Sequence, residues 1–159
     1  DFVVQKTTEL GVVGIRPVFT ERSVVKLDEK RSRRRLEHWR SVAISACEQS
    51  GRATLPEILT PIPLEPALLT IETGGLRILL DPCGESILPS GPLPAGGVTL
   101  LIGPEGGLSG AERRLARSLG FTSLAIGPRI LRTETAAVAA VTLIQSIWGD
   151  LSASGAPSR

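Results

Sequence analysis

Hydrophobic residues recur along the chain with two spacings, one typical of helices and the other of buried strands. The longest helical pattern has apolar residues at steps of three and four, namely Leu36, Trp39, Val42, Ala43, Ala46 and Cys47. It predicts a helix from Glu29 to about Ser50, with Asp28 as N-cap and Gly51 just after its end. The arginines of this segment fall on the opposite face, so we expect one face to be buried and the other exposed.

Other helices are predicted over residues 2–10, 109–120 and 133–148, with a helical turn over residues 65–69. Gly11 is a typical C-cap for the first of these helices. Ser109 and Glu112 form a capping box at the start of the second, which ends at Gly120. The first half of the last helix is rich in alanine, and this permits close packing within the domain or against a second subunit.

Short apolar runs predict strands at residues 12–19, 56–60, 76–81, 98–102 and 121–126. The third run is expected to end at Pro82, and a loop rich in proline, glycine and serine to cover Ser86 to Gly97. Because strands alternate with helices, we predict an α/β fold with a mainly parallel sheet. Ligands bind beyond the carboxyl ends of such strands, so the loops at Asp81, Gly103 and Gly127 are expected to converge.

Length and composition favour one compact domain. The chain has 159 residues, of which 42% are hydrophobic, which is enough for one sizeable core. We assign residues 1–150 to the domain and residues 151–159 to a disordered tail. No apolar run is long enough to span a membrane and no secretion signal is visible, so we expect a cytoplasmic protein. Methionine is absent, so we expect the chain to be part of a longer protein.

Charge and cysteine content narrow the chemistry. The formal net charge is only +2, but basic residues cluster from Lys30 to Arg35 and continue to Arg40. Such a run is either a solvated helix face or a stripe that contacts phosphates. Cys47, Cys83 and the single histidine, His38, lack the spacing of a metal site. We expect free, mostly buried thiols and a histidine used in packing or at the surface.

Two segments share one construction, in which an apolar strand runs into a Gly-Pro turn and a helix follows. We call residues 101–109 the first turn and residues 126–136 the second turn. Neither matches a phosphate loop or a dinucleotide-binding motif. Exposed backbone groups of such turns can hydrogen-bond an adenine edge or ribose hydroxyls, while apolar strand ends enclose the ring. In the second turn Thr133 or Thr135 can also serve simply as helix cap, with Glu134 complementing the helix dipole.

Four ordered blocks carry a family resemblance, namely residues 5–12, residues 46–52 with 56–58, residues 102–107 and residues 127–136. Together they closely resemble the catalytic domain of the RsmE-type ribosomal RNA small-subunit methyltransferases of the SPOUT superfamily, from Phe2 to about Asp150. The resemblance implies a trefoil-knotted, mostly parallel sheet flanked by helices. It also implies bound S-adenosylmethionine, a homodimer, no metal, and methylation of ring nitrogen 3 of one uridine in 16S rRNA of the small ribosomal subunit. Family members carry an N-terminal PUA-like barrel, which we expect outside these 159 residues.

The resemblance also implies roles for individual residues. The cofactor-binding candidates are Leu80, Pro82, Ile102, Gly103, Pro104, Glu105, Gly106, Gly107, Ile126, Gly127, Leu131, Arg132, Thr133, Thr135 and Ala136. The RNA-binding candidates are Arg31, Arg33, Arg34, Arg35, Arg52 and Arg129. Glu134 or Glu105 would remove the proton from the uracil nitrogen, and Arg132 would stabilise the resulting oxygen charge.

Two other functions remain open on the sequence alone. A non-catalytic RNA-binding module would keep the fold and the basic run of residues 30–40. A different small-molecule enzyme of the α/β class is less favoured, because the sequence shows no nucleophile–base pair, metal cluster or phosphate loop.

Overall fold

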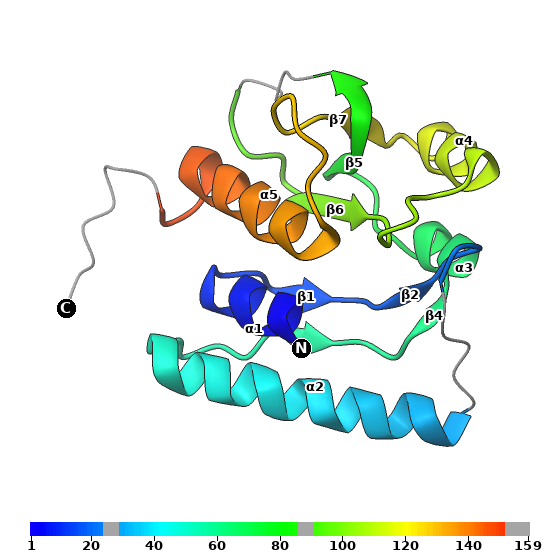
Figure 1. The fold of residues 1–159 in the computed structure, drawn as a ribbon. Helices are drawn as coiled ribbons and strands as arrows, with labels where there is room; N and C mark the ends of the chain where they lie inside the picture. The colour runs from blue at the N-terminus through cyan, green and yellow to red at the C-terminus, as the bar shows by residue number, and fades with distance from the viewer. Residues whose placement is uncertain (24–28, 86–90, 152–159) are drawn as a thin grey trace.

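A computed structural model describes residues 1–23, 29–85 and 91–151 of the protein (Figure 1). Five helices are present in these ranges, α1 (Phe2–Glu9), α2 (Glu29–Ser50), α3 (Leu64–Leu69), α4 (Gly110–Ser118) and α5 (Thr133–Trp148). The strands of the same ranges are β1 (Gly14–Ile15), β2 (Val18–Phe19), β3 (Glu57–Ile58), β4 (Ile62–Pro63), β5 (Leu76–Glu85), β6 (Val98–Ile102) and β7 (Thr122–Leu124).

All described strand pairs are parallel. Strand β5 lies between β6 and β7, while β1 pairs with β3 and β2 with β4. In the three-stranded sheet Leu80 is in register with Ile102 on one side and with Leu124 on the other. The carboxyl ends of these strands therefore meet at one edge. The predicted α/β class with parallel sheets flanked by helices is confirmed, and the knot stays a prediction.

Strand β5 continues beyond the predicted end at Pro82, so that boundary is wrong. Leu80 and Glu85 both pair with Leu124, and residues 81–84 form an irregularity between them. Pro82 has no N–H to donate, but it lies within the irregular stretch and leaves the ladder on either side intact. A Cβ on Gly84 would lie 2.7 Å from the backbone carbon of Ser123, so only glycine fits this close to β7.

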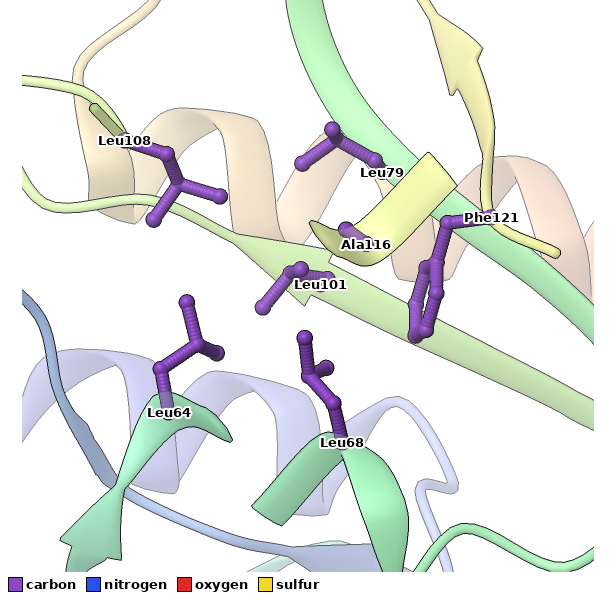
Figure 2. Close-up of a cluster of buried hydrophobic side chains, with 7 residues drawn as sticks. All are labelled: Leu64, Leu68, Leu79, Leu101, Leu108, Ala116 and Phe121. Carbon is purple, nitrogen blue, oxygen red and sulfur yellow. The ribbon is translucent and has the colours of Figure 1, made fainter. Parts of the chain in front are cut away.

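Two hydrophobic clusters hold the fold together. The larger, shown in Figure 2, contains Leu64, Leu68, Leu79, Leu101, Leu108, Ala116 and Phe121. It joins α3 and α4 to the three-stranded sheet, directly behind the carboxyl ends of β5 and β6. The smaller cluster contains Val4, Ala43 and Ile58, with Ile15, Leu36, Trp39 and Val42 packed against it. In Figure 1, α2 lies along the β1–β4 strands on the side away from β6.

Most predicted elements are confirmed. Helix α2 has the predicted bounds, its apolar face is buried at Ala43, Ala46 and Cys47, and the expected N-cap Asp28 lies outside the described residues. Helix α5 also has the predicted bounds. The strand predicted over 12–19 is split into β1 and β2 at Pro17, and the short strand β4 was not predicted.

The predictions for the cysteines and for the tail have different outcomes. Cys83 is exposed, so its predicted burial is wrong, because it lies in the irregular stretch of β5. Cys47 is buried as predicted, and exposed His38 lies with its Nε2 2.9 Å from Oδ2 of Asp1.

In the part of the chain that the structure describes, no helix is long and apolar enough to cross a membrane. Residues 152–159 of the tail expected over 151–159, like residues 86–90 of the predicted loop, lie outside the described ranges.

Candidate functional site

A cavity of about 290 Å³ lies where β5, β6 and β7 end. Its walls come from residues 79–82, from the first turn and from the second turn with the start of α5. The predicted convergence of the three loops is therefore confirmed. The volume is near the lower end of the range typical of small-molecule sites.

The cavity gathers most of the cofactor candidates. Those that line it are Leu80, Pro82, Ile102, Gly103, Pro104, Glu105, Gly107, Ile126, Leu131, Arg132, Thr133 and Ala136. Gly106, Gly127 and Thr135 do not line it. The lining residues that the sequence did not single out as cofactor candidates are Leu79, Asp81, Leu108, Arg113, Leu124, Arg129 and Ile130. Several of these directly adjoin predicted residues, so extending each strand-end motif by one or two positions would have found them.

The first turn is fixed by contacts with distant segments. The Gly107 N–H donates to the Pro104 carbonyl at 2.7 Å, and Arg22 Nη1 donates to the Gly106 carbonyl at 2.7 Å. The capping box follows, with Ser109 N–H donating to the Glu112 carboxylate at 2.8 Å. The other oxygen of that carboxylate accepts from the Glu21 N–H at 2.8 Å. These bonds anchor the first turn to α4 and to the segment after β2.

The two turns are joined by one hydrogen bond. The Thr133 hydroxyl donates to the Gly103 carbonyl at 3.1 Å. The N-cap of α5 is Arg132 and has no side-chain capping bond, so the expectation that Thr133 or Thr135 caps this helix is wrong. Thr133 is the first residue of α5 and not its N-cap, and its hydroxyl uses its single donor in the bond to Gly103.

Residues 127–130 and 132 of the second turn are exposed to solvent. Gly127 adopts a φ of +68°, and a Cβ placed there would meet no atom within 4 Å. Arg129, Ile130 and Arg132 are exposed, and Ile130 is 85% accessible. These three residues form the rim of the cavity, together with exposed Glu105 from the first turn.

Asp81 is a buried carboxylate in the cavity wall. It is 4% exposed, and its Oδ1 accepts from the Cys83 N–H at 3.0 Å. Arg117 Nη2 donates to Oδ2 at 3.4 Å and also to the Ser123 hydroxyl at 3.1 Å. Arg117 therefore ties α4 and β7 to the irregular stretch of β5. Burial of the carboxylate is tolerated because it is paired and hydrogen-bonded.

The three catalytic candidates differ in position. Glu105 and Arg132 line the cavity. Glu134 does not line it, is half-buried, and has Oε2 buried without a hydrogen-bond partner among the described residues. Its place in the first turn of α5 is favourable for a carboxylate because of the helix dipole.

The RNA-binding candidates occupy three different surroundings. Arg31, Arg33, Arg34 and Arg35 are exposed on α2, and the Arg35 guanidinium lies 5.8 Å from the centre of the Trp39 ring. Arg52 Nη1 donates to the carbonyls of Thr8 at 2.6 Å and Val12 at 3.0 Å, so it fastens the end of α1. Arg129 lies at the cavity rim. In Figure 1 the N-terminal end of α2 lies on the side toward which β1, β3 and β6 point.

The chemistry of the cavity lining suits a flat organic ligand. Within the described ranges no three His, Cys, Asp or Glu side chains form a group that could hold a metal. Apolar strand ends provide surfaces for a flat ring, turn carbonyls and N–H groups provide polar contacts, and arginines provide charge at the rim.

Known proteins share both the sequence and the fold. Residues 1–145 match the family model described as an RNA methyltransferase domain. The chain is 38% identical to ribosomal RNA small subunit methyltransferase E of Buchnera aphidicola subsp. Schizaphis graminum, over 96% of the chain and 62% of that protein. It is 37% identical to the protein of the same name from Bacillus subtilis, over 91% of the chain and 59% of that protein. The chain thus spans about three fifths of the length of these curated relatives.

A solved structure shares the fold of the chain. Ribosomal RNA small subunit methyltransferase E from Neisseria gonorrhoeae, crystallised with S-adenosyl methionine, superposes with a TM-score of 0.87 at 39% identity. The match covers 95% of this chain and 62% of that chain.

Proposed function

The chain belongs to the RNA methyltransferase domain family, and from this membership we propose that it methylates ring nitrogen 3 of one uridine in 16S rRNA of the small ribosomal subunit, using S-adenosylmethionine. The observation that carries the proposal is the cavity built by three strand-end loops. The N. gonorrhoeae relative, whose fold is shared along 95% of this chain, holds the same cofactor.

The cavity fits this cofactor by its chemistry. Leu80 of β5, Ile102 at the end of β6 and Ile126 just after β7 line the cavity and offer apolar surface to an adenine ring. The turn backbones beside them offer N–H and carbonyl groups for ring and ribose edges. A Cβ on Gly103 would lie 3.2 Å from Leu108 N, so glycine permits the tight approach between the two ends of the first turn.

The residues of the chain would position the base and accept its proton. When bound, S-adenosylmethionine supplies an electrophilic methyl group. Glu105 and Asp81 are the carboxylates that line the cavity, and Asp81 is already paired with Arg117. We therefore assign removal of the N3 proton to Glu105, rather than to Glu134, which does not line the cavity. Arg132 lines the same cavity and would donate hydrogen bonds to the uracil oxygen on which charge develops. The nitrogen–carbon bond then forms as the sulfur–carbon bond breaks, and the proton remains on Glu105.

The RNA would reach this site across a basic surface. Arg129 lies at the cavity rim, and four exposed arginines lie in the N-terminal part of α2, whose N-terminal end is on the side toward which β6 points in Figure 1. Arginine forks match phosphate oxygens, and this geometry supports their role as RNA contacts. The proposal includes the trefoil knot and the homodimer that the family resemblance implies, and a cytoplasmic location, where ribosomal particles are found.

Binding and transfer assays test the proposal separately. Calorimetry with S-adenosylmethionine and with its demethylated product should show binding to the chain. Tritiated-methyl transfer to small ribosomal subunits, followed by nucleoside analysis, should show label in 3-methyluridine. Absence of heat at millimolar ligand would contradict the cofactor assignment, and a different labelled nucleoside would contradict the substrate. Ligand binding by a chain that never transfers a methyl group would favour a non-catalytic RNA-binding module.

A further inference from the structure

Ile130 has the largest exposed fraction among the large apolar side chains of the described residues. It is 85% accessible although it lies in the second turn and lines the cavity. The next residue, Leu131, lines the same cavity but is half-buried. Ile130 therefore lines the cavity, but most of its surface is exposed to solvent at the rim. Burying this apolar surface against a partner would be favourable.

The charge around Ile130 indicates which partner fits. Arg113, Arg129 and Arg132 line the same cavity. The cavity acids are Glu105 and Asp81, and Asp81 is already paired with Arg117. A second copy placed on this rim would bring like-charged arginines together. A polyanion would bring phosphates to them, which favours RNA as the occupant.

The proposed reaction requires a base that has left its stack. Ring nitrogen 3 of uracil lies on the Watson–Crick edge, and it must reach a methyl donor held inside the cavity. Enzymes that act on a base extrude the nucleotide into a pocket. Proteins that unstack bases frequently insert an apolar side chain between the remaining bases. An exposed isoleucine between two arginines at the cavity mouth has the position and chemistry for this task.

We propose that Ile130 is an apolar wedge that enters the RNA stack beside the extruded uridine, while Arg129 contacts a flanking phosphate. Ile130 is then a positioning residue that favours the extruded state of the RNA. The inference rests on the proposed function and deepens it, because it assigns to the second turn the step that presents the base.

Four proteins test the wedge, namely wild type, Ile130→Ala, Ile130→Leu and Val13→Ala. Val13 is a matched control because it is 84% exposed and does not line the cavity. The first measurement is single-turnover methyl transfer to small ribosomal subunits. The second is the fluorescence of 2-aminopurine placed next to the target uridine in a synthetic rRNA fragment, which rises when the neighbouring base unstacks. Calorimetry with S-adenosylmethionine and sedimentation of each protein complete the set.

We expect Ile130→Ala to lower the transfer rate by roughly ten-fold, because the wedge offsets part of the cost of unstacking one base step. It should also abolish the fluorescence rise, with cofactor binding and sedimentation unchanged. Ile130→Leu should retain both signals, and Val13→Ala should behave as wild type.

Three results would overturn the wedge while the proposed function stands. The first is a normal transfer rate and fluorescence rise in Ile130→Ala. The second is weaker cofactor binding in that variant, which would make Ile130 part of the cofactor wall. The third is a changed sedimentation coefficient, which would make a second copy the occupant of the rim. If the wild-type protein transfers no methyl group, the proposed function itself fails, and the wedge fails with it.

Discussion

The two glycine turns have the same construction in sequence, yet the structure uses them differently. The first turn is bound by Arg22, by Thr133 and by the capping box that follows it. In the second turn, no side chain of the described residues is hydrogen-bonded to the backbone of residues 127–131, and Arg129 and Ile130 extend to solvent. The first turn is a fixed wall, whereas Arg129, Ile130 and Arg132 of the second turn form an open rim.

The difference fits the two ligands of the proposed reaction. A wall held in place before binding positions a small cofactor with little reorganisation. An open rim leaves side chains available to a large polyanion that arrives from solvent. A shared sequence pattern therefore indicates a shared backbone path, while the contacts from distant segments decide what each turn does.

The largest predicted effect is a loss of catalysis, and it should distinguish Glu105 of the first turn from Glu134 of the second turn. Glu105→Gln should lower kcat by about 1,000-fold, because general-base assistance is worth about 10²–10⁴. Glu134→Gln is the matched control and should change kcat far less, since Glu134 does not line the cavity. Single-turnover methyl transfer at several pH values measures both. The opposite ranking of the two variants would transfer the proton-accepting role to Glu134.

Replacing Arg132, at the cavity rim, should affect catalysis more than cofactor binding. Arg132→Ala should lower kcat by about 100-fold, the typical loss when one donor to a developing oxygen charge is removed. Its S-adenosylmethionine Kd should stay close to that of wild type, and Arg132→Lys should recover part of the rate. Calorimetry and methyl transfer are measured on the same preparations. An equal loss in both measurements would make Arg132 part of the cofactor wall.

The fixed state of the first turn should depend on Glu112. Glu112→Ala removes the acceptor for the N–H groups of Ser109 and Glu21, both at 2.8 Å. We expect the free energy of unfolding to fall by about 2 kcal/mol, because two hydrogen bonds to a charged carboxylate are lost, one of them at an exposed site. Glu112→Gln keeps one acceptor oxygen and should lose about half as much. Urea denaturation measures both, and equal stability of all three proteins would contradict the anchoring role.

The sequence was sufficient for elements whose signals are local. The apolar stripe of α2, the capping box of α4 and the bounds of α5 depend on residues within a few positions of one another. The convergence of the three loops was also predictable, because parallel strands place their carboxyl ends at one edge. Local sequence patterns and the geometry of parallel strands were therefore sufficient to predict where the cavity lies.

The contacts that distinguish the turns could not be predicted in this way. Arg22 bonds to Gly106 across 84 positions, and Arg117 bonds to Asp81 across 36. Thr133 resembled a helix cap, but its hydroxyl bonds to a carbonyl 30 positions away. The irregularity after Leu80 was missed because proline usually ends a strand, whereas here the ladder resumes at Glu85.

The bond between the turns should couple stability to cofactor binding. Thr133→Val keeps the shape of the side chain but removes the donor to the Gly103 carbonyl, 3.1 Å away. We expect a loss of about 1.5 kcal/mol in the free energy of unfolding, together with a weaker S-adenosylmethionine Kd. Thr133→Ser keeps the hydroxyl and should retain both properties. A destabilised protein with unchanged cofactor affinity would show that the bond supports the fold without shaping the cavity.

The smallest effect compares the glycines at the centre of each turn. Gly107 and Gly127 have φ values of +67° and +68°, and a Cβ at either position would meet no atom within 4 Å. Gly107→Ala and Gly127→Ala should therefore cost the same, about 1 kcal/mol of backbone strain. Only Gly107 lines the cavity, so only its replacement should weaken cofactor binding. If the two variants are equally stable but differ in their Kd for S-adenosylmethionine, the turns differ because of the residues around them. If the two variants differ in stability, the turns differ in their own backbones.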